Sequence, residues 1–291
     1  MSFKSGFVNI IGSPNVGKST LMNKLMGEKL SIVTSKAQTT RHRIHGILND
    51  ENFQVVFSDT PGVVNAAYEL HENMMSYVST AIKDADVILF ITDVFEKSTN
   101  HEQTLEQLKK INTPILCLVN KIDLKDQEEV GTVLKHWQTE LPNATVFPIS
   151  ALHGFNTEVI LDKILDLLPE GPAYFDKEAI SDRPMRFFIA EIIREKIFLN
   201  LKKEVPYACE VEVTDYIEDE EIIKIRANII VERDSQKGII IGSKGRQLKY
   251  IGIDARKDIE KFVEKKVFLQ TFVKVDKDWR NNPNKLKKYG Y

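Results

Sequence analysis

The stretch Gly12-Ser13-Pro14-Asn15-Val16-Gly17-Lys18-Ser19 decides the fold of the first half of the chain. It fits the pattern G-x-x-x-x-G-K-[ST] at every fixed position, a pattern in which backbone N–H groups surround phosphate oxygens. The apolar run at 7–11 predicts a buried strand before it, and the apolar spacing at 20–26 predicts a helix after it. We therefore expect a strand, a phosphate-binding loop (P-loop) and a helix, in that order.

This loop contains the groups that bind a nucleoside triphosphate. The Lys18 ammonium is expected to reach the β- and γ-phosphates, and the Ser19 hydroxyl to ligate Mg²⁺. The N-terminus of the following helix adds a partial positive charge. The predicted phosphate-binding residues are Gly12, Ser13, Pro14, Asn15, Val16, Gly17, Lys18, Ser19 and Thr20.

The composition is that of a globular protein with more than one domain. The chain has 291 residues, of which 42% are hydrophobic and 28% charged, and no apolar run approaches the roughly 18 residues that span a bilayer. We expect a cytoplasmic protein. Cys117 and Cys209 lie in apolar segments and are expected to be buried, reduced thiols. His42 and His45 lie in a polar stretch that we expect to be mobile, without a histidine metal site.

The charge is distributed unevenly along the chain. The net charge is −2, but residues 1–170 contain 15 Lys and Arg against 21 Asp and Glu, and residues 171–291 contain 25 against 21. From 237 to 291 there are 15 basic and 6 acidic residues. Such an excess is typical of a phosphate-binding surface, although a solvated, lysine-rich face would have the same composition.

Two further segments are expected beside the phosphates. Residues 31–41 are polar and lack periodicity, which predicts a loop, and either Thr39 or Thr40 could complete the Mg²⁺ shell and sense the γ-phosphate. A strand at 53–57 then leads into the sequence Asp-Thr-Pro-Gly, whose Asp59 could hold Mg²⁺ through water and whose Gly62 N–H could meet the γ-phosphate. The predicted nucleotide-binding residues here are Asp59, Thr60, Pro61, Gly62 and Val63.

Val63 stands where GTPases of the Ras type carry a glutamine that orients the attacking water. Hydrolysis must therefore proceed without that side chain. We expect Val63 to shield the water, while backbone groups or a partner orient it.

The motif Asn120-Lys121-Ile122-Asp123 follows an apolar run at 115–119 and predicts guanine recognition. The Asp123 carboxylate can accept hydrogen bonds from N1–H and the exocyclic amine of guanine, which adenine cannot supply, while the Lys121 stem covers the base. Asn120 is expected to tie this loop to its neighbours. A later strand at 146–149 ends in Ser150, Ala151 and Leu152, which are expected to bring a backbone N–H to the guanine O6.

Strands and helices alternate at least five times in the first 165 residues, which predicts an α/β fold with a mostly parallel sheet covered on both faces. We expect a GTP-binding domain at 1–170 and a linker at 171–183. The segment 184–291 is expected to form a second domain with the order α-β-β-α-α-β and a basic C-terminal tail.

The second domain contains a G-x-x-G loop between two predicted helices, which is typical of the type II KH fold, an α+β fold that binds single-stranded nucleic acid. A nucleic-acid backbone passes so close to this loop that a Cβ atom would collide with it. A helix-turn-helix core with a glycine turn is the alternative. The predicted RNA-binding residues are Ile241, Gly242, Ser243, Lys244, Gly245 and Arg246.

The motifs G-S-P-N-V-G-K-S, Q-T-T-R, D-T-P-G, N-K-I-D and S-A-L, followed by I-I-I-G-S-K-G-R, together resemble the Era family of bacterial ribosome-assembly GTPases over essentially the whole chain. The resemblance implies that Thr40, directly before the Arg of T-T-R, is the switch threonine. Lys18, Thr40 and Gly62 are then the catalytic candidates, and Ser19, Thr40 and Asp59 (through water) the metal-binding ones. It also implies that the KH groove binds the 3′ end of 16S rRNA in 30S subunit assembly.

The resemblance carries two further hypotheses. Related GTPases with a hydrophobic residue at the Val63 position often bind K⁺ through the P-loop asparagine, which here is Asn15. Family members also associate with the inner face of the cell membrane, which nothing in this sequence explains. We expect a monomer.

Two rival functions stay open at this point. The chain could be a non-enzymatic RNA-binding assembly factor that holds GTP as a structural ligand. It could also be a P-loop ATPase or small-molecule kinase, which the N-K-x-D motif disfavours.

Overall fold

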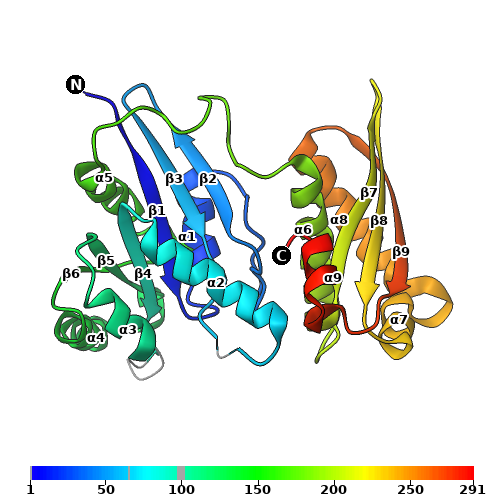
Figure 1. Cartoon of the computed structure of the whole chain (residues 1–291), viewed down its shortest axis with the longest axis horizontal. Coiled ribbons are helices and arrows are strands. Elements are labelled where there is room, and N and C mark those ends of the chain that lie inside the picture. The colour runs from blue at the N-terminus through cyan, green and yellow to red at the C-terminus, as the bar shows by residue number, and fades with distance from the viewer. Residues whose placement is uncertain (1, 65, 97–101) are drawn as a thin grey trace. The chain divides into compact units, whose positions relative to one another are not determined.

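The computed structural model describes residues 2–64, 66–96 and 102–291, and the described chain divides into two compact units. The first unit comprises Met1–Ala66 and Asn73–Asp182, and the second comprises Ala67–Glu72 and Arg183–Tyr291 (Figure 1). Residues 171–182 of the predicted linker at 171–183 are grouped with the first unit. The predicted domain limits stay a prediction.

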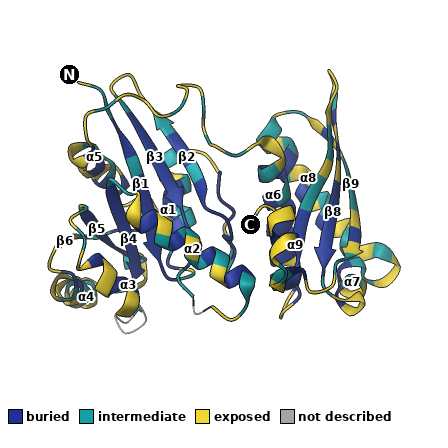
Figure 2. Cartoon of the chain, in the orientation of Figure 1, coloured by how far each residue is buried: buried dark blue, intermediate teal, exposed yellow. Residues whose placement is uncertain are grey.

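The first unit is built on a six-stranded sheet with the order β2-β3-β1-β4-β5-β6. All neighbouring strands are parallel except β2, which pairs antiparallel with β3. The central strands are buried on both faces (Figure 2), which explains their continuous apolar sequences. The strands are β1 Lys4–Gly12, β2 Ile44–Asn49, β3 Phe53–Asp59, β4 Val87–Asp93, β5 Ile115–Asn120 and β6 Ala144–Pro148.

Helices cover both faces of this sheet. Val78, Leu105 and Trp137, one each from α2, α3 and α4, pack into a single core with β1, β4 and β5. On the other face α1 contacts α5, β1 and β3. The helices are α1 Lys18–Met26, α2 Glu69–Lys83, α3 Glu102–Leu108, α4 Gln127–Glu140 and α5 Thr157–Leu167, and of α2 the part from Asn73 onward belongs to this unit. Because parallel strands end at one edge, the loops after β1, β3 and β5 lie at the same edge.

The structure corrects the expectation of a mobile polar stretch around His42 and His45. His42 is buried, and His45 lies within β2, where its Nδ1 is 3.1 Å from Oδ2 of Asp182. The backbone of β2 pairs with β3 along its whole length. Pairing with a neighbouring strand and with a segment distant in sequence therefore orders this stretch, despite its polar residues and its Gly46.

The segment before residue 183 lies along the outer edge of β2. Ile47 N donates to Ile180 O at 3.0 Å, and Ser181 Oγ donates to His45 O at 2.5 Å. Gln54 Oε1 accepts from the backbone N–H of Tyr174 and of Phe175. The segment that we predict to be a linker is therefore hydrogen-bonded to the first unit.

The second unit has the predicted order α-β-β-α-α-β. Its sheet has the order β7-β8-β9, with β7 antiparallel and β9 parallel to β8. Three helices, α6, α7 and α8, share one core with this sheet, which contains Ile193, Ile240 and Ile259. The elements are α6 Met185–Asn200, β7 Glu210–Glu218, β8 Ile222–Val231, α7 Asp234–Ile241, α8 Arg246–Val263, β9 Lys266–Val275 and α9 Pro283–Lys288.

The C-terminal segment completes the second unit. Trp279 is fully buried, and its Nε1 donates to Ala208 O at 3.1 Å. Tyr289 Oη donates to Asp276 at 2.7 Å, and Tyr291 Oη donates to Glu210 at 2.5 Å. These contacts hold the end of the chain against the fold. Cys117 and Cys209 are buried, as predicted.

Candidate nucleotide site and nucleic-acid loop

The P-loop connects β1 to α1, and its shape depends on Gly17. This residue has a φ of 103°, and a Cβ placed there would lie 2.2 Å from Nδ2 of Asn120. Any side chain at 17 would therefore strain the backbone and displace a neighbouring loop. Asn15 also has a positive φ, and its Nδ2 donates to Ser35 O at 3.1 Å. A glycine is thus required at position 17 for two reasons. It leaves room for the Asn120 side chain, and it lets a phosphate come close to the backbone of the loop.

The Lys18 side chain lies inside the loop and is almost completely buried. Its Nζ donates to the carbonyls of Gly12, at 3.1 Å, and Ser13, at 2.7 Å. Burial lowers the pKa of Lys18 to about 8, partly offset by the negative charges of Asp59 and Glu96. An ammonium held in this way is positioned to meet an anion and is stabilised by one.

Ser19, Thr40 and Asp59 form a cluster at the start of α1. Ser19 Oγ donates to Asp59 Oδ2 at 2.6 Å and lies 3.0 Å from Thr40 Oγ1, which is 3.4 Å from the same carboxylate oxygen. Burial raises the pKa of Asp59, while the hydrogen bond from Ser19 and the charge of Lys18 lower it. Asp59 Oδ1 is buried without a hydrogen-bond partner among the described residues. Two hydroxyls and a partly unsatisfied carboxylate are hard oxygen donors that fit Mg²⁺.

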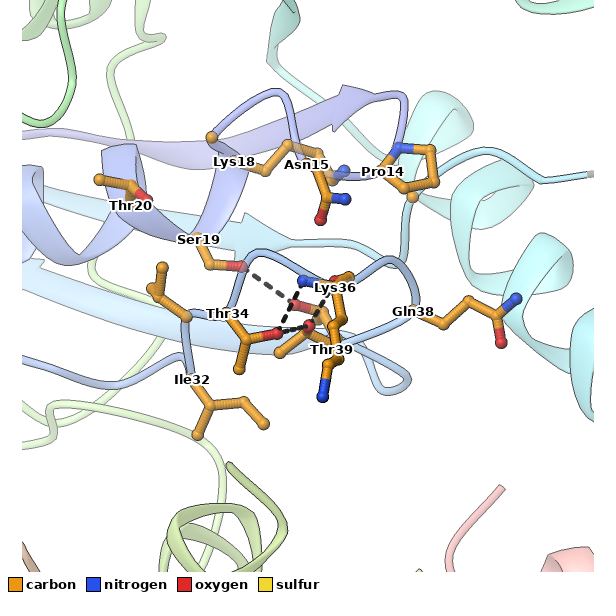
Figure 3. Close-up of a pocket in the computed structure, with 14 residues that line it drawn as sticks. Pro14, Asn15, Lys18, Ser19, Thr20, Ile32, Thr34, Lys36, Gln38 and Thr39 are labelled. Atoms are coloured by element: carbon orange, nitrogen blue, oxygen red, sulfur yellow. Dashed lines mark hydrogen bonds between the residues drawn. The ribbon is translucent and has the colours of Figure 1, made fainter. Parts of the chain in front are cut away.

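A pocket of about 90 Å³ lies between the P-loop and the segment 32–40. Figure 3 shows Pro14 and Asn15 on one side of it and Thr34, Lys36 and Thr39 on the other. Thr39 Oγ1 is 2.7 Å from Thr34 Oγ1 and donates to Lys36 O, whereas Thr40 belongs to the Ser19 cluster. The geometry favours Thr40 over Thr39 as the threonine next to the metal position.

Asn120 links three loops of the site. Its Nδ2 donates to Val16 O in the P-loop at 2.7 Å, and its Oδ1 accepts from the Ala151 N–H at 2.9 Å. The side chain is buried at the end of β5. The N-K-x-D, S-A-L and P-loop segments are therefore held together by one amide.

The two charged residues of N-K-x-D have defined partners. Lys121 Nζ donates to Asp93 Oδ2 at 2.6 Å, and Asp123 Oδ1 accepts from Ser150 Oγ at 2.6 Å. Asp123 Oδ2 lies 3.8 Å from His153 Nε2. Ser150 thus fixes the carboxylate that we expect to read guanine.

The D-T-P-G segment packs directly against the P-loop. Thr60 Oγ1 donates to Ile10 O at 2.7 Å, and Val63 N donates to Gly12 O at 3.1 Å. A Cβ at Gly62 would lie 2.7 Å from the Pro14 ring. The segment therefore reaches the phosphate side of the loop only because residue 62 lacks a side chain.

All the residues predicted for the nucleotide site lie at strand ends, in loops or at helix starts along the carboxyl edge of the first unit's sheet. Leu152 is exposed. Two groups of neighbours are missing from the prediction. Asp93, which holds Lys121, could have been found as an acidic residue at the end of a buried strand. The pocket residues Ile32, Val33, Thr34, Lys36 and Gln38 have no signal in the sequence beyond the polar character of their loop.

The G-x-x-G loop of the second unit lies between α7 and α8. Gly242 has a φ of 68°, and a Cβ there would lie 2.6 Å from Cβ of Gln247. Lys244 has a φ of 50°, and Arg246 begins α8. Ser243, Lys244 and Arg246 are not buried. A tight turn with two accessible cations at a helix start can contact a phosphate backbone.

Comparison with known proteins assigns both units. The model of the family described as 50S ribosome-binding GTPase matches residues 7–121, and that of the KH domain matches residues 204–280. GTPase Era of Alkaliphilus metalliredigens is 45% identical over 294 residues, covering all of both chains. The chain belongs to the Era family of GTPases. Era of Leuconostoc citreum is 47% identical over 295 residues, which is all of this chain and 97% of that one.

Solved Era structures have the same fold as this chain. One, Era in complex with MgGDPNP and nucleotides 1506–1542 of 16S ribosomal RNA, superposes with a TM-score of 0.94 at 37% identity, covering 99% of each chain. A variant of Era from Aquifex aeolicus bound to GDP and AlF4⁻ has a TM-score of 0.95 at the same identity and coverage. The predicted α/β GTPase fold followed by a KH domain is confirmed. Among the described helices, none is long and apolar enough to cross a bilayer.

Proposed function

We propose that this Era-family chain is a GTP-hydrolysing switch whose KH unit binds the 3′ end of 16S rRNA during 30S subunit assembly. The observation that carries the proposal is the cluster of Ser19, Thr40 and Asp59 beside the buried Lys18. The Asp59 carboxylate, at the end of β3, contacts Ser19 after the P-loop and Thr40 in the segment 31–41. A metal ion and γ-phosphate bound at this cluster would contact all three segments, so loss of the γ-phosphate could change the conformation of each.

Lys18 and the P-loop supply the electrostatic stabilisation of phosphoryl transfer. The Lys18 ammonium is held by two loop carbonyls within hydrogen-bond distance and is desolvated, so it is preorganised for phosphate oxygens. The Gly62 N–H is proposed to contact the γ-phosphate. Asp123, fixed by Ser150, selects guanine, and Lys121, fixed by Asp93, covers the base.

Ser19 and Thr40 would ligate Mg²⁺ directly, and Asp59 would hold it through water. The ion would supply charge neutralisation between the β- and γ-phosphates. The partly unsatisfied carboxylate of Asp59 supports this assignment.

We further propose that Asn15 takes part in binding K⁺ as an additional charge neutraliser. Its side chain lines the pocket and is anchored by the Nδ2 hydrogen bond to Ser35 O, which leaves the amide oxygen as the available ligand. Val63 cannot orient water through a side chain, because it has no polar group. Intrinsic hydrolysis is therefore expected to be slow, with an added cation or a partner accelerating it.

The Gly242–Gly245 loop is the proposed RNA contact. Lys244 and Arg246 are exposed cations on either side of Gly245, which has a φ of 75° and open space where a Cβ would stand. A side chain added at Gly245 would lie where the nucleic-acid backbone approaches. Binding of RNA at this loop is proposed to be coupled to the nucleotide state of the first unit.

The test is GTP hydrolysis in K⁺ buffer with and without a short RNA that copies the 3′ end of 16S rRNA. The variant is Gly245→Asp, and the matched control is Gly131→Asp in α4, which adds the same charge where a side chain meets open space. We expect RNA to accelerate the wild type and the control but not Gly245→Asp.

Two other results would revise the proposal. RNA that binds without changing the rate would mean that the KH unit only delivers the GTPase to its target. A protein that binds GTP and RNA but shows no hydrolysis, even with 30S subunits, would favour the rival function of a non-enzymatic assembly factor.

The cellular setting belongs to the same proposal. A GTPase that acts on the small subunit works in the cytoplasm, and we propose that the chain acts there as a monomer. Association with the inner face of the cell membrane would then be peripheral, since no described helix could span it.

A further inference from the structure

The sheet of the second unit has two faces of different chemistry. On one face alternate residues of β8 and β9, such as Ile223, Ile225 and Val267, join the core under α6, α7 and α8. The residues between them point to the opposite face. We call this opposite side the outer face. The residues that define it are Ile217, Lys224, Arg226, Lys266, Phe268, Phe272 and Lys274.

This outer face exposes large apolar side chains that a folded protein normally buries. Phe268 is 51% exposed, Phe272 is 45% exposed and Ile217 is 55% exposed. In the strand pairing Phe268 stands beside Lys224, and Lys224 stands beside Ile217, so the side chains form one continuous surface. Buried and exposed positions alternate at both ends of β9, from Lys266 to Phe268 and from Phe272 to Lys274. Clustered exposed aromatic residues mark an interaction site.

The β8 and β9 part of this face carries positive charge, while its β7 edge carries the carboxylates of Glu210, Glu212 and Asp215. Lys266 and Lys274 are exposed at either end of β9, and neither has a carboxylate within ion-pair distance among the described residues. Lys224 pairs with Asp219 at 2.6 Å, and Arg226 lies 3.5 Å from Asp215. Both of these pairs are about half exposed, so water and salt weaken them and the cations stay available to another anion.

The arrangement of rings and cations fits nucleobases. The Arg226 guanidinium lies 5.9 Å from the centroid of the Phe272 ring. A base can stack on either a phenyl ring or a guanidinium plane. Phe268 and Phe272 are four residues apart on one strand, which separates them by roughly 13 Å. Stacked bases are about 3.4 Å apart along one strand of a duplex, so the two rings suit a single strand whose bases are unstacked.

We propose that the outer face is a second binding surface for single-stranded RNA, with Phe268 and Phe272 stacking on bases and Lys266, Lys274 and Arg226 contacting phosphates. The inference rests on the proposed RNA-binding function of the second unit and extends it to a surface away from the G-x-x-G loop. Positive charge together with aromatic rings distinguishes RNA from an apolar protein partner, which would need no row of cations.

The experiment compares two single-stranded oligouridylates on the full-length protein. A KH groove holds about four nucleotides, so an RNA of about 6 nucleotides fills the groove alone, while one of about 24 can also reach the outer face. The variant is Phe268→Ala with Phe272→Ala. The matched control is Leu199→Ala, which removes a side chain that is 58% exposed on α6.

We expect the double variant to bind the short RNA like the wild type and the long RNA roughly tenfold or more weakly, the loss of one to two stacked bases. Leu199→Ala should bind both like the wild type. A 4-thiouridine in the long RNA should crosslink to the peptide that contains Phe268. Thermal melting of each variant ensures that the comparison is made between folded proteins.

Three results would overturn the proposal. The double variant could bind the long RNA like the wild type, or it could lose equal affinity for both RNAs, which would place the effect in the groove. In a parallel assay with phosphatidylglycerol vesicles, the double variant could lose vesicle binding while its affinity for the long RNA stays that of the wild type. The outer face would then be a membrane contact. Lys244→Asp separates this proposal from the proposed function, because it should weaken both RNAs whatever the outer face does.

Discussion

Asn120→Ala tests whether one amide holds the nucleotide site together. The substitution removes two buried hydrogen bonds and leaves Val16 O and Ala151 N, both in almost fully buried residues, without those partners. Each unsatisfied buried group costs about 1–3 kcal/mol, so the two together lower the free energy of unfolding by about 2–6 kcal/mol. For a unit of this size each kcal/mol lowers the melting temperature by about 2–4 °C. We therefore expect the melting temperature to fall by about 4–24 °C and the GTP affinity to weaken roughly tenfold.

The assay is differential scanning calorimetry, following the transition that added GDP shifts, together with GTP titration. In Asn120→Asp one carboxylate oxygen still accepts from Ala151 N, but the other replaces the amide donor and lies against the Val16 carbonyl oxygen. This substitution should therefore lower stability and GTP affinity at least as much as Asn120→Ala. Asn143→Ala is the control, since it removes one amide bond to a backbone carbonyl from an exposed residue of the same unit. If Asn120→Ala melted and bound GTP like the Asn143 control, the linking role of Asn120 would be refuted.

Three further predictions follow from the site. Because burial lowers the pKa of Lys18 to about 8, the protonated fraction of the free protein falls roughly tenfold from pH 7 to pH 9, and GTP affinity should fall with it; guanosine, which lacks phosphates, controls for ionisation of the base. Between pH 8 and 10.5 the unfolded chain binds more protons at this lysine, so its contribution to stability rises with pH there. Asp123→Asn should shift preference from guanine toward xanthine nucleotides by about 100-fold or more, measured by competition, and an unchanged preference would refute the base-reading role. Hydrolysis should be faster in K⁺ than in Na⁺ and should lose this difference in Asn15→Ala; equal turnover of the wild type in both salts would reject K⁺ binding.

Sequence patterns predicted the strands that are buried on both sides. Runs such as 87–91 and 115–119 are apolar throughout and end in motif residues, so type and position could be inferred together. The alternation in Ile222–Val231 likewise predicted β8 with its observed limits. In these segments the sequence itself favours a strand, and the structure has a strand there.

The strand β2 was missed because its stability is not local. Its sequence contains His45 and Gly46 and has no clear alternation, and it forms by pairing with β3 on one edge. The network around Arg43 is similar, because Arg43 donates to Ser58, Asp84 and Asn9, which lie far apart in the sequence. Nothing in the sequence indicates that these four residues meet.

Within the site, motif residues were found because the chemistry of phosphate and guanine restricts both residue type and spacing. Asp93 was not found, because it acts by orienting Lys121 rather than by touching the nucleotide. Ser150 was predicted as part of the S-A-L segment, but its hydrogen bond to Asp123 was not. Many side chains could do this from many positions, so such residues leave no fixed spacing in a sequence.

The segment docked on the outer edge of β2 has a practical consequence for anyone who isolates the GTPase unit. An edge strand with free N–H and C=O groups is a template for pairing with another chain. Here Ile47 N is occupied by Ile180 O, and Gly46 bridges Ser181. A fragment cut at residue 170 would uncover that edge and invite self-association, whereas one that extends through Asp182 keeps its own protective strand.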